Sequence, residues 1–278
     1  MKKHYGLIGY PLGHSLSPQI HERLFKMAGI EADYEMIEIP PEKLKDNFDY
    51  LKTLDGFNVT MPHKANIIEF CNCLSETAQR YGSVNTIKTE DGENMGYNTD
   101  AYGFITSITH MGANSSTDVC LLGCGGVGRM IAIESACVAS KLTIAVREED
   151  IFSAGEMKEN IEAEVSQISN CTVDVILLSE VKGGYDLVIN ATPVGMYPNV
   201  DASPLKKEQL EGVKYLFDAV YNPVETLLMR YAKELGTKVC GGMPMLVLQA
   251  AAAHQVWNDT QYEPDDIRQL IRDMEALV

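Results

Sequence analysis

Short apolar runs alternate with amphipathic stretches along the first hundred residues. Runs at about His4–Gly9 and Tyr34–Ile39 predict strands, and a helix between them ends at Gly29. Ser17 followed by Pro18 predicts the start of that helix, with Ser17 as the N-cap. Glu42–Leu54 shows one apolar face and predicts a second helix, ended by Gly56. This part of the chain therefore mixes strands and helices.

The pattern becomes more regular after residue 112. The later apolar runs that predict strands are Val119–Leu122, Leu142–Val146, Thr172–Leu177, Leu187–Asn190 and Lys214–Asp218. Helical stretches fit between them, and Thr226–Leu235 is one of these. Strands that alternate with helices predict a parallel, doubly wound sheet, whose ligands lie at the carboxyl ends of the strands. Two further helices, through Met245–Trp257 and Ile267–Leu277, fall outside this alternation, and we expect them to return to the N-terminal domain.

A glycine-rich turn follows the first of these strands. Gly123, Gly125 and Gly128 have G-x-G-x-x-G spacing, with a strand before them and a helix after them. The first glycine permits a tight turn, the second lets the backbone approach a pyrophosphate, and the third lets the helix pack closely on the strand. Unpaired N–H groups at the helix start would then bind the phosphates. This context favours a dinucleotide site over an ordinary glycine turn.

The fold class that follows is α/β with two domains. We expect an N-terminal α/β domain over residues 1–112, completed by the helices of residues 243–278, and a dinucleotide-binding domain with a parallel, doubly wound sheet over residues 113–242. The polar, serine-rich segment Gly112–Asp118 would connect them.

Charge and cysteine content narrow the class of ligand. The net charge of −16 argues against a nucleic-acid partner, because a duplex binder needs a basic surface. Anionic ligands would have to be held by local donors within roughly 8 Å, the screening distance at physiological salt. No run approaches the roughly 18 apolar residues of a membrane helix, and no signal peptide is recognisable. Seven scattered cysteines without zinc-ligand spacing predict free thiols and no metal, so we expect a cytoplasmic protein.

Polar residues at three strand or helix ends are candidates for binding. Ser15 and Ser17 beside a helix start could form a carboxylate pocket, or could serve only as loop and cap residues. His14 and His21 read as structural. Asn58, Thr60 and Lys64 follow one another at the end of a predicted strand and could bond to a polyhydroxylated ligand. The alternative is a solvated strand end, since most lysines lie on the surface without a binding role. Asp100 precedes a predicted helix, and an N-cap role alone would explain why an aspartate stands there.

These segments together resemble the shikimate dehydrogenase family along nearly the whole chain. The matching motifs are Gly9-Tyr10-Pro11, His14-Ser15-Leu16-Ser17-Pro18, Asn58-Val59-Thr60-Met61-Pro62-His63-Lys64, Val84-Asn85-Thr86, Asn98-Thr99-Asp100, Asp218–Pro223 and Met245–Ala250. The resemblance implies reversible NADP-linked reduction of 3-dehydroshikimate to shikimate, a step of aromatic amino acid (chorismate) biosynthesis.

The resemblance also implies that residues 1–112 with residues 243–278 form the substrate-binding domain, and that residues 113–242 form a Rossmann-like cofactor domain. It implies a role for each matched position as well. Lys64 would be the acid/base residue, paired with Asp100. Ser15, Ser17 and Thr60 would hold the substrate carboxylate with help from Tyr221, while Asn58, Asn85, Asp100 and Gln249 would bind elsewhere on the substrate. The cofactor would contact Gly123, Gly125, Gly126, Val127, Gly128, Arg147, Thr192, Ala219 and Gly242.

The choice of cofactor depends on the end of the second nucleotide-domain strand. The family usually has Asn-Arg-Thr or Asn-Arg-Ser there, whereas this chain has Val146-Arg147-Glu148. Arg147 could face a 2′-phosphate, but Glu148 would repel one. NADP is the expected cofactor, with NAD as the alternative. Other departures, such as Ala101 where glycine is usual, remove no reacting group.

Two other functions compete with this expectation. The first is a quinate/shikimate dehydrogenase that uses NAD, and the second is a regulatory module that binds a nucleotide without catalysis. The expected partner is the small-molecule substrate alone, with no nucleic acid and no membrane, and the protein would be a monomer or homodimer.

Overall fold

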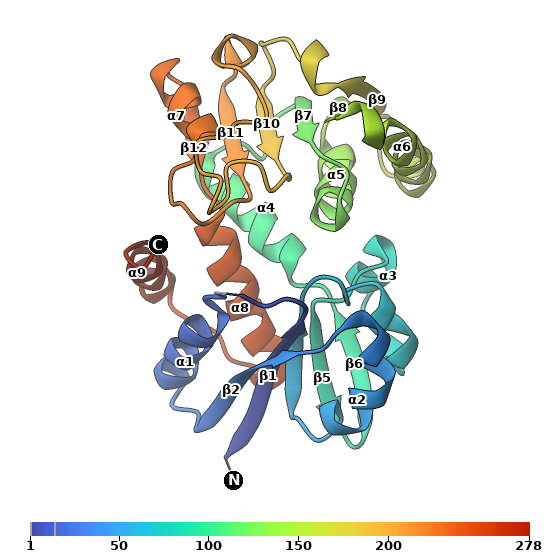
Figure 1. Ribbon diagram of the computed structural model, residues 1–278, viewed down its shortest axis with the longest axis vertical. Coiled ribbons are helices and arrows are strands. Elements are labelled where there is room, and N and C mark those ends of the chain that lie inside the picture. Colours follow the sequence, from blue (N-terminus) through green and yellow to red (C-terminus); the bar gives the residue numbers. More distant parts are fainter. Residues whose placement is uncertain (1, 14) are drawn as a thin grey trace. The chain divides into compact units, whose positions relative to one another are not determined.

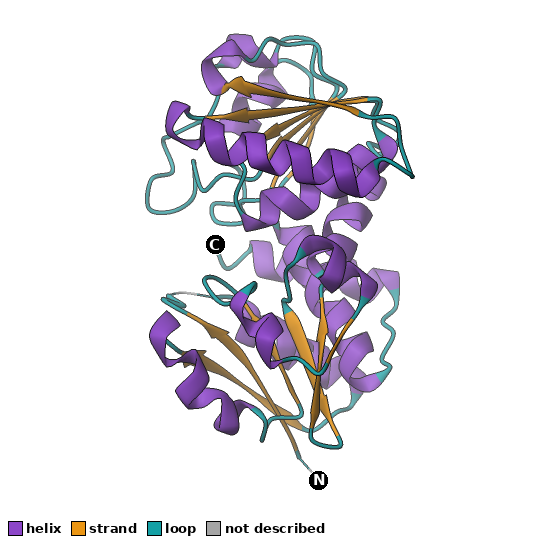
Figure 2. Ribbon diagram, turned by 90° about the vertical axis from the view of Figure 1, so that its right-hand side faces the viewer, coloured by secondary structure: helices purple, strands orange, loops and turns teal. Residues whose placement is uncertain are grey.

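The computed structural model describes residues 2–13 and 15–278, so the expectation for His14 lies outside the described residues. The chain forms two compact units. One runs up to Tyr102 and includes Val247–Met274; the other comprises Gly103–Leu246 with Glu275–Val278. In both units helices flank the strands of a sheet (Figure 1, Figure 2). None of the helices in the described ranges combines the length and the apolar character needed to cross a membrane.

The first unit is built on a mixed six-stranded sheet with the strand order β2-β1-β3-β5-β6-β4. Its strands are β1 (Lys3–Gly9), β2 (Ala32–Glu38), β3 (Gly56–Val59), β4 (Cys73–Leu74), β5 (Thr86–Glu90) and β6 (Glu93–Tyr97). Its helices are α1 (Ser17–Ala28), α2 (Leu44–Leu51), α3 (Glu76–Tyr81) and α9 (Pro264–Glu275), with 3-10 turns at Pro41–Lys43 and Asn66–Phe70. Helices α4 (Asp100–Met111) and α8 (Met243–Asn258) each continue into the second unit. Strands β1, β2 and β3 run parallel, which places their carboxyl ends at one edge.

Local sequence signals account for several turns of this unit. Asp91 and Gly92 form a hairpin turn: both residues have positive φ angles, 52° and 81°, and they join the antiparallel strands β5 and β6. Gly29 ends α1 in the left-handed conformation, with φ 65°.

Two predictions about helix ends were wrong. Ser17 is the first residue of α1 and not its cap; Leu16 is at the cap position and makes no side-chain capping bond. The hydroxyl of Ser17 instead accepts a hydrogen bond from Ser15. The helix predicted to reach Leu54 ends at Leu51, because the amide and the hydroxyl of Thr53 both bond to the carbonyl of Tyr50 and tighten the last turn.

The C-terminal end of α8 packs into the core of the first unit. The indole of Trp257 stacks on Tyr5 with ring centroids 4.6 Å apart, and its N–H donates to the carbonyl of Ile87 at 2.8 Å. A side chain at Gly56 would meet the Trp257 indole nitrogen at 2.5 Å, so this close approach needs a glycine. The last helices therefore contribute buried contacts to a sheet made from the first hundred residues.

The second unit has a six-stranded parallel sheet with the order β12-β11-β10-β7-β8-β9. Its strands are β7 (Asp118–Leu122), β8 (Lys141–Val146), β9 (Thr172–Leu177), β10 (Leu187–Asn190), β11 (Tyr215–Asp218) and β12 (Lys238–Cys240). Its helices are α5 (Gly126–Val138), α6 (Ile151–Val165) and α7 (Leu227–Glu234), with 3-10 turns at Glu148–Asp150, Leu178–Glu180 and Lys207–Leu210. The predicted parallel, doubly wound sheet is confirmed. Strand β12 was not predicted, since its three residues give too short a pattern.

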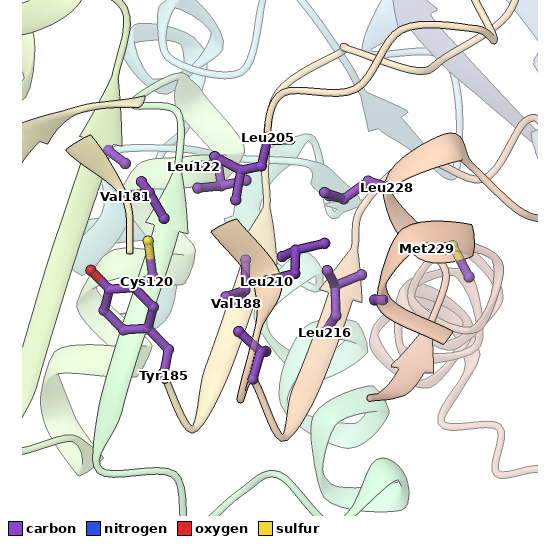
Figure 3. Packing of buried hydrophobic residues seen from close by; sticks show 13 residues of the cluster. Cys120, Leu122, Val181, Tyr185, Val188, Leu205, Leu210, Leu216, Leu228 and Met229 are labelled. Carbon is purple, nitrogen blue, oxygen red and sulfur yellow. The ribbon is translucent and has the colours of Figure 1, made fainter. Parts of the chain in front are cut away.

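The strand order reverses at β7. From β7 the chain adds β8 and β9 on one side, and it then crosses back to add β10, β11 and β12 on the other side. In open parallel sheets such a switch point forms a crevice at the carboxyl ends of the strands. Buried residues from β7, β10, β11 and α7 pack together in one core cluster; among them are Cys120, Val188, Leu216 and Leu228 (Figure 3).

Candidate functional site

A lysine and a carboxylate from separate segments meet in the first unit. Nζ of Lys64 lies 2.6 Å from Oδ2 of Asp100, and the two side chains retain 21% and 13% of their exposure. Lys64 follows β3, where its carbonyl accepts a hydrogen bond from Val84. Asp100 is the first residue of α4, and its carboxylate accepts hydrogen bonds from Lys64 and Asn85. The pair is therefore fixed and still partly accessible, as an acid/base group must be.

Asn85 links this pair to α8. Its amide nitrogen lies 2.9 Å from Oδ1 of Asp100 and 3.4 Å from the side-chain oxygen of Gln249, and its own oxygen accepts from the amide of Thr99 at 2.7 Å. Four of the residues implied by the family resemblance, Lys64, Asp100, Asn85 and Gln249, thus lie in one bonded group, although they come from four segments of the chain.

Asn58 is bonded entirely within the protein. Its side-chain oxygen accepts from the hydroxyl of Tyr34 at 2.8 Å, and its amide donates to the carbonyl of Asn85 and the hydroxyl of Thr86. Asn58 is only 5% exposed. These bonds make it a brace between β2, β3 and β5. Sequence reasoning missed the part played by Tyr34, because an aromatic residue in a strand carries no signal of its bonding partner.

Two hydroxyl-bearing segments follow the parallel strands β1 and β3. Ser15 and Ser17 lie 3.1 Å apart, oxygen to oxygen, and the hydroxyl of Ser15 also accepts from the amide of Ser17. Thr60 directly follows β3, and its methyl group is so close to Gly9 that a side chain at Gly9 would meet it at 2.5 Å. The carboxyl ends of β1 and β3 thus bring hydroxyl groups to one edge of the sheet, beside the start of α1.

The glycine turn of the second unit has the geometry that its spacing predicts. Gly123 has φ 95°, and a side chain on Gly128 would meet the carbonyl oxygen of Gly123 at 2.9 Å. Gly125 and Gly126 face open space, with nothing within 4 Å of an added Cβ. Helix α5 begins at Gly126, so its first N–H groups have no partner inside the helix. Together these features leave an open cradle of backbone donors that fits a pyrophosphate.

We expect Gly123→Ala to weaken dinucleotide binding. Alanine at φ 95° is strained, and its Cβ would lie 2.8 Å from the methyl group of Thr192. The strain costs about 1–2 kcal/mol, which should appear both as a lower melting temperature and as a higher Kd for the dinucleotide in calorimetric titration. The matched control is Gly155→Ala inside α6, where the added methyl meets nothing; it should be neutral or stabilising. Equal behaviour of the two variants would contradict this account.

Buried hydrogen bonds fix the ends of the neighbouring strands β10 and β11. Oδ1 of Asp218 accepts from Asn190 at 2.9 Å and from the amide of Val220 at 3.0 Å, and its Oδ2 accepts from Thr226 at 2.7 Å. Asn190 in turn accepts from the amide and the hydroxyl of Thr192. This network, Thr226-Asp218-Asn190-Thr192, holds Thr192 against the glycine turn.

Burial of Asp218 makes the stability of the second unit depend on pH. Desolvation raises the pKa of Asp218 to about 6, despite the donors that favour its ionised form. Between the usual carboxyl value near 4 and pH 6, the folded state holds a proton on Asp218 that the unfolded state releases, so the contribution of Asp218 to stability should fall as pH rises. The loss amounts to about 3 kcal/mol.

Urea unfolding at pH 4 and pH 7 checks this expectation. The free energy of unfolding of Asp218→Asn, relative to that of the native protein at the same pH, should rise by about 2 kcal/mol from pH 4 to pH 7, whereas the exposed Asp201→Asn should follow the native profile. Parallel pH profiles for native protein and Asp218→Asn would contradict the assigned pKa.

Three further candidates for cofactor or substrate binding lie in the second unit. The amide of Gly242 donates to the carbonyl of Val220, and a side chain at Gly242 would come within 2.2 Å of the carbonyl of Ala219. These two segments therefore touch backbone to backbone next to the end of β11. Tyr221 follows them, and burial raises the pKa of its hydroxyl.

Arg147 is exposed at the end of β8, where its guanidinium is paired with two acids. Nη2 lies 2.8 Å from Oδ2 of Asp150, and Nη1 lies 3.0 Å from Oε1 of Glu149.

Comparison with known proteins gives consistent results across the chain. Residues 7–87 match the model of the shikimate dehydrogenase substrate binding domain. A shikimate dehydrogenase (NADP(+)) of Methanocaldococcus jannaschii is 37% identical over 94% of this chain and 92% of its own length. Among solved structures, a shikimate dehydrogenase in complex with NADP+ superposes with a TM-score of 0.90 at 34% identity, covering 98% of this chain and 96% of that one. A Listeria monocytogenes shikimate 5-dehydrogenase in complex with shikimate and NAD has a TM-score of 0.86 at 27% identity, covering 97% and 96%.

Proposed function

The chain belongs to the shikimate dehydrogenase family, and on this premise we propose that it catalyses the reversible NADP-linked reduction of 3-dehydroshikimate to shikimate. The observation that carries the proposal is the contact of 2.6 Å between Lys64 and Asp100, held by Asn85 and left partly open. It supports the proposal because Lys64 would transfer the proton beside residues that can bind the hydroxyl groups of a ring.

The substrate residues divide by chemistry. The carboxylate would lie at Ser15, Ser17 and Thr60, where hydroxyl donors hold an anion without a buried counter-charge. The ring hydroxyls would bond to Asn85, Asp100 and Gln249, whose amide and carboxylate groups can donate and accept. Asn58 would contribute indirectly, because its amide holds the backbone carbonyl of Asn85 in position. We assign Tyr221 to the substrate carboxylate as well, on the family pattern.

The chemistry assigned to this chain's residues is proton transfer. Reduction of a carbonyl group adds a hydride to carbon and a proton to oxygen, and the bound cofactor supplies or receives the hydride. Lys64 would give the proton to the new hydroxyl during reduction and take it back during oxidation. Asp100 would hold the amine in position with one oxygen while the other stays bonded to Asn85. Because the acid/base group is already in place, little reorganisation is needed at the moment of reaction.

The second unit supplies a cradle that fits the dinucleotide. Gly123, Gly125, Gly126, Val127 and Gly128 would hold the pyrophosphate at the start of α5. Thr192, Ala219 and Gly242 lie at the ends of β10 and β11 or touch them, where the rest of the cofactor would extend, and Arg147 would face the adenosine end. The net charge of −16 repels an anionic ligand at long range, so the pyrophosphate must be held by local donors such as these backbone N–H groups.

The decisive experiment follows nicotinamide absorbance when shikimate is added to protein and NADP. Reduction of NADP supports the proposal, while its absence with a folded protein that binds NADP would favour a non-catalytic module. Comparing kcat/KM for shikimate and quinate, each with NADP and NAD, separates the quinate/shikimate alternative, because a pocket built for one polyol can discriminate by up to roughly 10⁴.

We also propose a cytoplasmic location and a monomer or homodimer. All seven cysteines are free thiols, as expected of a protein in a reducing compartment. Gel filtration with light scattering would measure the number of subunits.

A further inference from the structure

We propose that Glu149 and Asp150 compete with the cofactor's 2′-phosphate for Arg147, and so set how strongly this chain prefers NADP over NAD. The inference rests on the proposed function, because it concerns the adenosine end of the same dinucleotide site.

The acid pair engages both sides of the guanidinium. Oδ2 of Asp150 lies 2.9 Å from Nε and 2.8 Å from Nη2 of Arg147, while Oε1 of Glu149 lies 3.0 Å from Nη1. A guanidinium binds a phosphate with the same planar fork of N–H groups. The edge formed by Nε and Nη2 and the opposite Nη1 are therefore already bonded, and a 2′-phosphate must displace carboxylates to reach them.

The local backbone keeps the acids beside the arginine. Arg147 directly follows β8, and Glu148–Asp150 form a 3-10 turn that leads into α6. The amide of Asp150 donates to the carbonyl of Arg147 at 3.1 Å, which closes the turn. The pairing thus follows from a short, bonded turn and not from a long flexible loop.

The electrostatic effect of Arg147 and Asp150 reaches the glycine loop. Burial raises the pKa of the Cys124 thiol, and the charges of Asp150 and Arg147 act on it in opposite directions. Cys124 lies between Gly123 and Gly125, so the Arg147 group is close enough to influence a nucleotide bound there. Glu148 adds a third negative charge to the turn.

The two cofactors respond differently to this arrangement. NADP brings a doubly charged phosphate that needs the guanidinium and is repelled by three acids. NAD brings a hydroxyl that can donate to a carboxylate. We infer that the acid pair lowers the affinity for NADP while leaving that for NAD nearly unchanged.

The test is calorimetric titration of native protein and the double variant Glu149→Gln/Asp150→Asn with NADP and with NAD. Both positions are on the surface turn, and each replacement keeps the shape of the side chain. The Kd for NADP should fall about 5- to 20-fold, because the variant frees Arg147 from two exposed ion pairs and removes two charges that repel the 2′-phosphate. The Kd for NAD should stay within about twofold of the native value. The matched control is Glu159→Gln, an exposed acid on α6, which should change neither value.

Each outcome decides the proposal. A ratio of the two Kd values that stays the same in the double variant, in a protein that oxidises shikimate, would overturn this inference alone. Failure of both dinucleotides to bind native protein and variant would overturn the proposed function together with it. A gain for NADP that shrinks in high salt supports the inference, because exposed charges are screened.

Discussion

Lys64→Ala is expected to lower kcat by about 10²–10⁴-fold while the protein stays folded. The variant loses the group that would transfer the proton. Its fold should persist because Asp100 keeps its bond to Asn85 and the lost side chain is partly exposed. If Lys64 acts on the proton and not in binding, KM for shikimate should change much less than kcat.

The measurement is steady-state oxidation of shikimate, with circular dichroism to verify folding. Lys26→Ala removes an exposed lysine of α1 and serves as the matched control, with no expected loss. If Lys64→Ala retains near-native kcat, Lys64 is not the acid/base residue, and another group must be sought among the residues around Asp100.

The second large effect concerns a buried pair of histidines in the first unit. Nδ1 of His21 lies 3.0 Å from Nε2 of His254, and Nδ1 of His254 lies 2.7 Å from the hydroxyl of Tyr262. That hydroxyl donates to the carbonyl of Leu24, so His254 must donate to Tyr262 and accept from His21. The sequence indicated that His21 is structural, and its ring is fully buried, stacked on Tyr34 with centroids 4.1 Å apart.

Burial keeps both histidines neutral and makes the fold sensitive to acid. Desolvation lowers the pKa of His254 to about 3 and that of His21 well below its usual range. An unfolded histidine takes up a proton near pH 6.5. Stability should therefore be complete above that value and fall as pH drops, because only the unfolded state gains the proton. His254 alone contributes a loss on the order of 5 kcal/mol by pH 3, or about 2 kcal/mol at pH 5.

Urea unfolding of His254→Phe at pH 7.5 and pH 5 tests this expectation. Phenylalanine keeps the ring contacts with Phe25 and Trp257 but cannot titrate. The variant should be less stable than native protein at pH 7.5, where it loses two buried hydrogen bonds, and the difference should narrow by about 2 kcal/mol at pH 5. The exposed His110→Gln is the control and should follow the native profile. A constant difference at both pH values would show that His254 is not held neutral by burial.

Much of the architecture could be predicted because it depends on local rules. The bounds Leu187–Asn190 were predicted as found, since this strand is buried along its whole length and shows as a short apolar run. Thr172–Leu177 was also predicted as found, although it is an edge strand in which only Val173 is buried. The structure differs from the prediction where a side chain could bond to more than one partner. Ser17 was expected to cap a helix, but its hydroxyl bonds to Ser15 instead. A capping residue and a pocket residue look identical in sequence, because both are a small hydroxyl before a helix.

The sequence by itself determined the residue types of the candidate site, the glycine turn and the alternation of strands and helices, because backbone dihedrals, periodicity and motif spacing are properties of neighbours along the chain. Only the tertiary structure decided which partners those side chains have: that Asn85 bonds to Asp100 and Gln249, and that Tyr34 fixes Asn58. Most of these contacts join residues far apart in the sequence, and each donor there has several acceptors of equal chemistry. Packing of the elements selects among them.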